Sequence, residues 1–157
     1  MIIGIAAVDR KGAIGKGGKL PWHYSADMKF FRETTTGHAV VMGRKTWLTI
    51  GKPLKNRLNI VLSRDSSIEP QESLVVFSDI DSVLSFSHSL TTDLFVIGGA
   101  QIYEAFMAHI EKWVITEVPL TVSGADAFMP KGYLDGFQLV ESKSIGEHLV
   151  VNSYLHG

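Results

Sequence analysis

The sequence predicts an α/β domain of three layers, in which about four helices cover both faces of a mostly parallel sheet of about eight strands. Short runs rich in β-branched residues alternate along the chain with segments of helical period, which is typical of parallel strands joined by crossover helices. Near the end, two extended segments flank Gly146-Glu147 and predict an antiparallel hairpin. No repeat, linker or low-complexity tract divides the sequence, so we expect one domain over residues 1–157.

The strands are predicted where apolar residues run together. The first run, Ile2–Val8, has no basic lead and meets Asp9 too early for a secretory or membrane segment, so we expect a buried strand. The other parallel strands are predicted at Ala39–Met42, Leu58–Leu62, Leu74–Phe77, Leu94–Ile97 and Trp113–Val118, and the hairpin strands at Phe137–Ile145 and His148–Leu155.

Helical period fills the intervals between these strands. Helices are predicted at Ser25–Thr35, Arg44–Ile50, Ile80–Ser87 and Ala100–Ile110. The last of them has the clearest apolar stripe, formed by Ile102, Tyr103, Phe106, Met107 and Ile110.

Composition narrows the class of ligand. A chain of 157 residues can bury roughly two-thirds of its unfolded surface, enough for a closed site. Its formal net charge is −1 and its charged residues are spread along the chain, so neither a nucleic-acid nor a membrane partner is indicated, and a small ligand is favoured. The absence of cysteine excludes disulfides and thiolate chemistry and agrees with a cytosolic protein. The six histidines show no metal-ligand spacing, so no metal is expected.

A single carboxylate, Asp27, lies inside an apolar and aromatic stretch. Removing an ionised carboxylate from water is costly, so Asp27 must reach solvent, shift its pKa, or bind a ligand that donates hydrogen bonds to it. One interpretation is structural: Ser25 caps the helix, and Asp27 stabilises the positive end of the helix dipole. The neighbouring Trp22 and Phe31, and an upstream glycine-rich segment 12–18 that we expect to be too flexible for the core, favour a ligand site.

Two strand-to-helix turns contain glycine and indicate an anion site. Gly43 precedes Arg44-Lys45, whose charges have the wrong sign for the start of a helix unless an anion binds there or both side chains point into solvent. Gly98-Gly99 in the second turn would let a ligand approach the backbone closely. Because these turns and Ser63-Arg64 follow parallel strands, we expect them together at the carboxyl edge of the sheet, where such folds bind nucleotides.

Arg57 stands at the start of a predicted strand. It is either an exposed cation at the edge of the sheet or a clamp for a ligand carboxylate, whose geometry a guanidinium matches. Sequence spacing leaves both interpretations open.

Over nearly its whole length the chain resembles the bacterial dihydrofolate reductase family. The motifs that carry the resemblance, in order, are Leu20-Pro21-Trp22 with Asp27 and Phe31, Val41-Met42-Gly43-Arg44-Lys45-Thr46, Ile50-Gly51 with Pro53-Leu54 and Arg57, Ile97-Gly98-Gly99 with Tyr103, and Thr116 followed by Asp126. The resemblance implies an oxidoreductase that reduces 7,8-dihydrofolate to 5,6,7,8-tetrahydrofolate with NADPH, by hydride transfer to C6 and protonation at N5, for one-carbon metabolism. It also implies a cytoplasmic enzyme, expected to be a monomer, that diaminopyrimidine and pteridine antifolates inhibit.

On the substrate side, the resemblance pairs Asp27 with the ring nitrogen and amino group of the pterin and places Thr116 in the same network. Trp22 would hold an ordered water near that carboxylate, and Arg57 would bind the α-carboxylate of the glutamate tail. Since no other ionisable side chain is expected near the pterin, we infer that Asp27 orients the substrate and favours its protonated form while a water delivers the proton. The implied catalytic residues are Asp27, Trp22 and Leu20, and the other substrate contacts are Ile5, Ala7, Met28, Phe31, Ile50, Leu54, Ile97 and Tyr103.

On the cofactor side, the resemblance implies three groups of contacts. Those at the 2′-phosphate are Arg44, Ser63 and Arg64, those at the pyrophosphate are Lys45 and Thr46, and those near the nicotinamide are Ala7, Ile14 and Leu20. The segment Gly15–Leu20 would act as a lid that excludes water during hydride transfer. The remaining implied cofactor residues are Gly15, Gly43, Leu62, Ile97, Gly98, Gly99, Ala100, Gln101, Ile102, Tyr103 and Asp126.

The chain departs from the family's pattern in places. Ser25 stands where many members have proline, Ala100-Gln101 where glycine and a basic residue are frequent, and the terminal hairpin is shorter than in many members. Two alternatives stay open: a pyrimidine reductase of riboflavin synthesis on the same fold, which should lack the Trp22 and Asp27 signature, and a nucleotide-binding module without catalysis.

Overall fold

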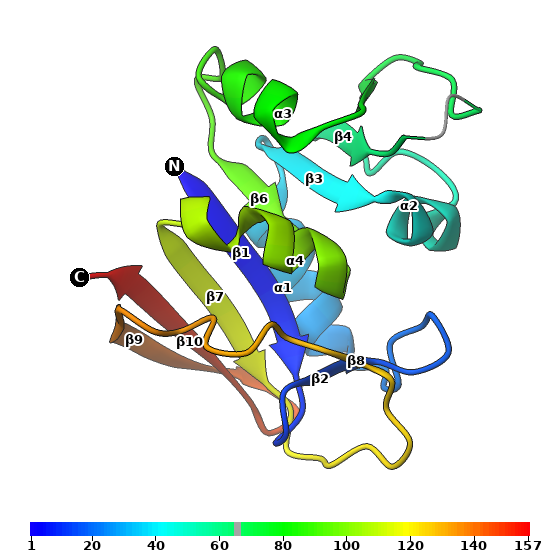
Figure 1. The fold of residues 1–157 in the computed structure, drawn as a ribbon. Coiled ribbons are helices and arrows are strands. Elements are labelled where there is room, and N and C mark those ends of the chain that lie inside the picture. Colours follow the sequence, from blue (N-terminus) through cyan, green and yellow to red (C-terminus); the bar gives the residue numbers. More distant parts are fainter. Residues whose placement is uncertain (65–66) are drawn as a thin grey trace.

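The computed structural model describes residues 1–64 and 67–157. In this part of the chain an eight-stranded sheet has the order β5-β4-β3-β6-β1-β7-β10-β9 (Figure 1). The strands are β1 Ile2–Val8, β3 Ala39–Gly43, β4 Leu58–Leu62, β5 Leu74–Phe77, β6 Leu94–Val96, β7 Lys112–Glu117, β9 Phe137–Gly146 and β10 Leu149–His156. The helices are α1 Ser25–Thr35, α2 Arg44–Ile50, α3 Ile80–Ser87 and α4 Ala100–Phe106.

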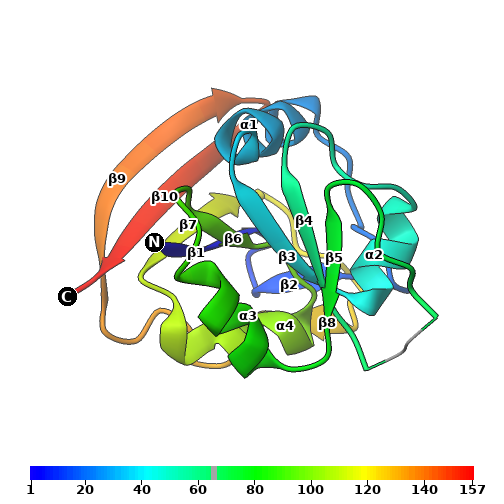
Figure 2. The same ribbon diagram turned by 90° about the horizontal axis from the view of Figure 1, so that it is seen from above.

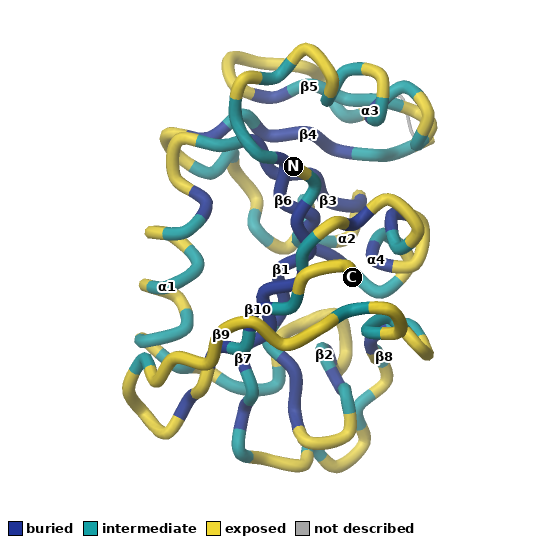
Figure 3. Tube along the Cα trace, turned by 90° about the vertical axis from the view of Figure 1, so that its left-hand side faces the viewer, coloured by how far each residue is buried: buried dark blue, intermediate teal, exposed yellow. Residues whose placement is uncertain are grey.

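Neighbouring strands from β5 to β7 pair in parallel, and β10 pairs antiparallel with both β7 and β9. The predicted mostly parallel sheet with an antiparallel terminal hairpin is therefore confirmed. β9 is one of the two edge strands and is exposed over most of its length, whereas the strands at the centre are buried (Figure 3).

Alternating side chains of the strands form two cores, one on each face of the sheet. The α4-side cluster joins Val41 and Ile115 to Val83 of α3 and Phe106 of α4. The α1-side cluster contains the buried residues Ile3, Ile5, Val40, Met42, Val61, Leu74, Phe95, Val114 and Val151. Partly buried residues of α1 and α2, such as Phe31 and Ile50, pack against it, so helices cover both faces (Figure 2). The predicted three layers are confirmed.

Element ends differ from the predictions by a residue or two, with one larger exception. The predicted helix Ala100–Ile110 ends as an α-helix at Phe106, and a 3₁₀ turn over Met107–His109 follows it. Such tighter turns are common where a helix ends, and this one leads to Ile110, whose extended backbone begins the approach to β7. Its predicted apolar stripe still holds, because Tyr103, Phe106 and Ile110 are all buried.

The predicted cap of α1 by Ser25 is wrong. The helix begins at Ser25, and the residue in the N-cap position is Tyr24, whose backbone is extended and whose side chain makes no capping hydrogen bond. Asp27 does lie in the first turn, as the structural interpretation held. The N-terminal amides of α1 must therefore find a partner elsewhere.

The glycine-rich segment 12–18 is not wholly flexible, which corrects the prediction. Ala13–Gly15 forms β2, which pairs antiparallel with β8 at Ala127–Phe128, and Ala13 is fully buried. The tip alone is exposed, where Lys16 and Lys19 face each other across a turn. Tertiary pairing with a distant segment, which local sequence does not encode, therefore outweighs the flexibility of glycine here.

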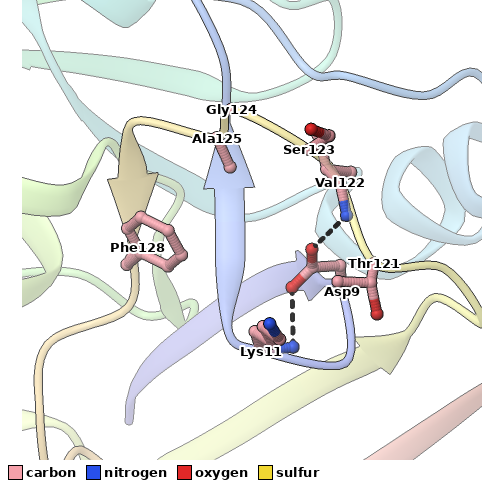
Figure 4. Close-up of a pocket in the computed structure, with 8 residues that line it drawn as sticks. All are labelled: Asp9, Lys11, Thr121, Val122, Ser123, Gly124, Ala125 and Phe128. Carbon is pink, nitrogen blue, oxygen red and sulfur yellow. Dashed lines mark hydrogen bonds between the residues drawn. The ribbon is translucent and has the colours of Figure 1, made fainter.

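Asp9 holds this small sheet in place. Its Oδ1 accepts hydrogen bonds from the N–H groups of Lys11 and Ala13, each at 2.8 Å, and its Oδ2 accepts one from Val122 at 2.8 Å. Figure 4 shows two of these bonds beside a pocket of about 410 Å³. Burial opposes the charge, but the three backbone donors together lower the pKa of Asp9 below its usual value. Asp9 thereby joins the end of β1 to the segment that leads to β8.

Candidate active site

The solitary carboxylate of Asp27 is the third residue of α1 and is partly buried. Burial raises its pKa, and an interaction with the side chain of Thr116 on β7 lowers it in part. Thr116 is itself buried, so the pair joins the first turn of α1 to the centre of the sheet. Of the three outcomes expected for this carboxylate, partial burial favours the second, a shifted pKa, and Thr116 lies close enough for the predicted shared network, which stays a prediction.

The indole N–H of Trp22, five residues before Asp27 in the sequence, is buried and has no hydrogen-bond acceptor among the described residues. Leaving a buried donor unsatisfied costs about 1–3 kcal/mol, so such groups are rare and invite explanation. An indole N–H is only a donor, so whatever satisfies it must bring an acceptor.

The predicted apolar wall is largely assembled by the fold. Ile5, Phe31, Ile50, Leu54 and Ile97 all belong to, or pack against, the α1-side cluster although they come from five separate parts of the chain. Ala7 lies two residues beyond Ile5 on β1 and so faces the same side of the sheet.

Several predicted site residues lie outside this wall. Met28 and Leu20 are 55% and 59% exposed, so neither is part of the packed wall. Ile14 packs against the α4-side cluster instead. Their predicted contacts with substrate or cofactor stay predictions.

Arg57 is buried, so its interpretation as an exposed edge cation is wrong. Its Nε donates to the carbonyl of Lys55 at 2.9 Å, its Nη1 donates to Oγ1 of Thr35 at 3.0 Å, and its guanidinium lies 5.9 Å from the ring centre of Phe31. Burial, and then the charge of Arg32, lower the pKa of Arg57. Among the described residues no carboxylate forms an ion pair with it, which leaves the charge suited to a ligand carboxylate.

The two glycine turns meet at the carboxyl edge of the sheet, as predicted. The N–H of Gly43 donates to the carbonyl of Gly98 at 2.9 Å. A Cβ on Gly43 would lie 2.8 Å from Cγ1 of Ile102, and Gly98 has a left-handed φ of 116°. Side chains are therefore disfavoured at both positions, whereas a Cβ on the neighbouring Gly99 would meet only Oγ1 of Thr46 at 4.0 Å, so the backbone is most accessible there.

Tyr103 packs beneath the glycine turns and contacts both β1 and Gly98. It is buried, and its hydroxyl donates to the carbonyl of Ile5 at 2.7 Å, while its ring lies 3.3 Å from where a Cβ on Gly98 would stand. Burial raises its pKa, and the negative charge of Asp27 raises it further. Tyr103 thus links β1 to the second glycine turn, and its hydroxyl is already engaged.

The tip of the predicted lid is held by Asp126. Its Oδ2 accepts a hydrogen bond from the N–H of Gly17 at 3.0 Å, and its own N–H donates to the carbonyl of Gly15 at 3.1 Å. The role of Asp9 in the same region was missed from sequence, although Asp9-Arg10-Lys11-Gly12 at the end of a strand is a typical aspartate turn.

The sheet order and the glycine turns at its carboxyl edge are typical of α/β enzymes that bind ligands at that edge, and α1 adds a partly buried acid. The family model for dihydrofolate reductase matches residues 1–154. The chain therefore belongs to the dihydrofolate reductase family and is an oxidoreductase.

Individual relatives agree with this assignment. The dihydrofolate reductase of Bacillus subtilis is 38% identical over 143 residues, which are 91% of this chain and 83% of that protein. The Staphylococcus aureus enzyme is 32% identical over 155 residues, 97% of this chain and 94% of that protein. A solved structure of dihydrofolate reductase from Enterococcus faecalis, complexed with NADP(H) and RAB-propyl, is 27% identical, covers 100% of this chain and 96% of that one, and superposes with a TM-score of 0.90.

Two features are absent from the described residues. None of their helices has the length and apolar character needed to cross a membrane. Within the same residues, no group of three or more histidine, aspartate or glutamate side chains could hold a metal ion.

Proposed function

We propose that residues 1–157 form one domain and that Asp27 is the residue that binds the pterin in the reduction of 7,8-dihydrofolate to 5,6,7,8-tetrahydrofolate with NADPH, the reaction of the family to which the chain belongs. The observation that carries the proposal is the partly buried carboxylate of Asp27, whose pKa is raised by burial and which interacts with Thr116. Family membership supports the reaction, and the burial and contacts of the site residues support the roles proposed for them.

Asp27 accepts hydrogen bonds from the ring N–H and amino group of the pterin, with Thr116 fixing the carboxylate. A negative charge held in apolar surroundings stabilises a protonated substrate more strongly than the same charge in water would. Asp27 therefore favours protonation at N5, which makes C6 a better acceptor of hydride. When bound, NADPH supplies that hydride.

The unpaired indole donor of Trp22 fits an ordered water that passes a proton toward N5. Such a water can accept from the indole and donate onward, which satisfies the buried N–H. Asp27 is then an orienting and electrostatic group, and the proton that reaches N5 comes from solvent.

Arg57 binds the α-carboxylate of the glutamate tail. Its buried guanidinium is already fixed by Thr35, Lys55 and the ring of Phe31, so little conformational freedom remains to be lost when the ligand arrives. A carboxylate would complete its missing ion pair.

The carboxyl edge of the sheet fits a dinucleotide such as NADPH. Gly99, where an added Cβ would meet only Oγ1 of Thr46 at 4.0 Å, lets a ligand approach the backbone closely, and the N-cap residues of α2 and α4, Gly43 and Gly99, provide no side-chain cap to their helices. We assign Arg44, Ser63 and Arg64 to the 2′-phosphate and Lys45 and Thr46 to the pyrophosphate. The turn at Lys16–Lys19, held by Asp126, closes over the nicotinamide.

The deciding assay follows the loss of NADPH absorbance in the presence of dihydrofolate, with Asp27→Asn as the test variant. We expect the variant to keep its fold and its NADPH binding but to lose orders of magnitude in activity at neutral pH, with partial recovery in acid, where the substrate is protonated in solution. Near-native activity of Asp27→Asn at pH 7 would contradict the assigned role.

The same assay separates the alternatives. A nucleotide-binding module would bind NADPH without oxidising it, and a pyrimidine reductase would oxidise NADPH with a pyrimidine substrate and leave dihydrofolate unchanged. A diaminopyrimidine antifolate should compete with dihydrofolate and lose affinity in Asp27→Asn, because its protonated ring needs the carboxylate. We also propose a monomeric, cytoplasmic enzyme, which gel filtration and cell fractionation would test.

A further inference from the structure

The helix that bears Asp27 obtains its cap from the far end of the chain. Tyr24, in the N-cap position, makes no side-chain capping bond. Instead, Oε1 of Glu147 accepts a hydrogen bond from the N–H of Ala26 at 2.7 Å, across 121 positions of sequence. Ala26 is in the first turn of α1, where backbone N–H groups have no partner within the helix. A carboxylate there also favours the positive end of the helix dipole.

The turn that presents Glu147 is built against backbone preference. Glu147 and His148 have φ values of 55° and 63°, the left-handed region that a tight hairpin turn requires and that Asn and Gly occupy most readily. Histidine is tolerated in this region, so the backbone strain of the turn falls mainly on Glu147. Strain of this kind persists where surrounding contacts hold it, and the bond to Ala26 is such a contact.

The residues just before this turn also lie against α1. Ile145, just before the turn, packs against the α1-side cluster together with Phe31 of α1. A Cβ on Gly146 would lie 3.9 Å from Cβ of Ala26, which is ordinary van der Waals contact. Figure 2 shows the end of β9 beside α1. The hydrogen bond is therefore one part of a fitted contact between the hairpin and the helix.

We propose that Glu147 is a positioning residue for the substrate site: by capping Ala26 it fixes the first turn of α1, and with it the backbone from which Asp27 reaches Thr116. The inference rests on the proposed function, because it concerns the residue assigned to the pterin. Asp27 follows Ala26 directly, so fraying of this turn displaces its carboxylate. The cofactor residues lie on other elements and are not displaced.

The test compares Glu147→Ala with Glu147→Gln, which keeps a side-chain acceptor, and with Glu141→Ala, which removes an exposed acid from the same hairpin. Loss of a helix cap shifts a local equilibrium by roughly 2- to 30-fold. We therefore expect Glu147→Ala to raise the KM for dihydrofolate by about fivefold while the KM for NADPH stays within about twofold. Glu147→Gln should recover at least half of the loss, and Glu141→Ala should match the wild type.

Amide hydrogen exchange gives a readout that needs no activity. Exchange at Ala26, and at Met28, whose N–H donates to the carbonyl of Tyr24 at 3.1 Å, should accelerate by a similar factor in Glu147→Ala and not in Glu141→Ala. Unchanged exchange at Ala26, equal effects on the two KM values, or no recovery by Glu147→Gln would each overturn the proposal. If the wild type oxidises no NADPH with dihydrofolate, the proposed function is wrong, and exchange at Ala26 still decides whether Glu147 is the cap.

Discussion

Replacement of Asp9 by asparagine should destabilise the fold although the two side chains have nearly the same shape. The asparagine oxygen could still accept from Lys11 and Ala13, but its amide group would then present N–H donors to the N–H of Val122, which now donates to Oδ2 at 2.8 Å. A hydrogen bond to a charged group is worth about 1.5–3 kcal/mol, and the side chain is 2% exposed although it borders a pocket, so water is a poor substitute for the lost acceptor. We expect the free energy of unfolding to fall by about that amount.

The pH dependence of this loss has a definite sign. The native pKa of Asp9 lies below its usual value, so ionisation contributes stability above that usual value, and this contribution disappears as pH falls through the native pKa. The part of the difference in free energy of unfolding between wild type and Asp9→Asn that is due to the charge should therefore be largest at pH 7 and decrease in acid.

Urea unfolding at a series of pH values, with thermal melts at pH 7, measures both quantities. For a chain of this size we expect the melting temperature to fall by roughly 3–12 °C. Asp135→Asn, which neutralises an exposed acid, is the matched control and should change little. Equal stability of Asp9→Asn and wild type at pH 7, or a difference that stays constant in acid, would refute the stabilising role assigned to the Asp9 carboxylate.

Two further predictions concern buried groups. Arg57→Met should raise the KM for dihydrofolate by roughly 10- to 150-fold, since a charge-assisted hydrogen bond is worth about 1.5–3 kcal/mol. The free energy of unfolding should stay within about 1 kcal/mol of the wild type, because the substitution removes a buried cation whose pKa burial lowers. Steady-state kinetics and urea unfolding test this, and a large loss of stability with an unchanged KM would contradict it. Gly4→Ala should destabilise by about 1–3 kcal/mol, because its Cβ would lie 2.2 Å from Cζ3 of the fully buried Trp113, and a melting temperature equal to that of the wild type would show that the ring can move aside.

The local sequence pattern was sufficient to predict those helices and strands whose bounds are set by their own residues. The bounds of β4, β5, α1, α2 and α3 agree with the predictions, because period and glycine turns mark them directly. Pairing between distant segments left no such mark: Ala13 gives no sign of Phe128 as its partner, and Glu147 no sign of Ala26. The burial of Arg57 belongs to the same class, since a strand-start arginine is equally compatible with solvent until Thr35 and Phe31 are placed around it.

The unpaired cation of Arg57 has a thermodynamic consequence for ligand discovery. The ligand-free protein keeps a buried charge that lacks an opposite charge among the described residues, so a bound carboxylate stabilises the native state through that pair in addition to its other contacts. Melting temperature then reports the chemistry of a ligand as well as its affinity. Folate-like compounds that reach Arg57 and compact antifolates that stop short of it should separate into two groups in a thermal-shift screen, when compared at equal occupancy.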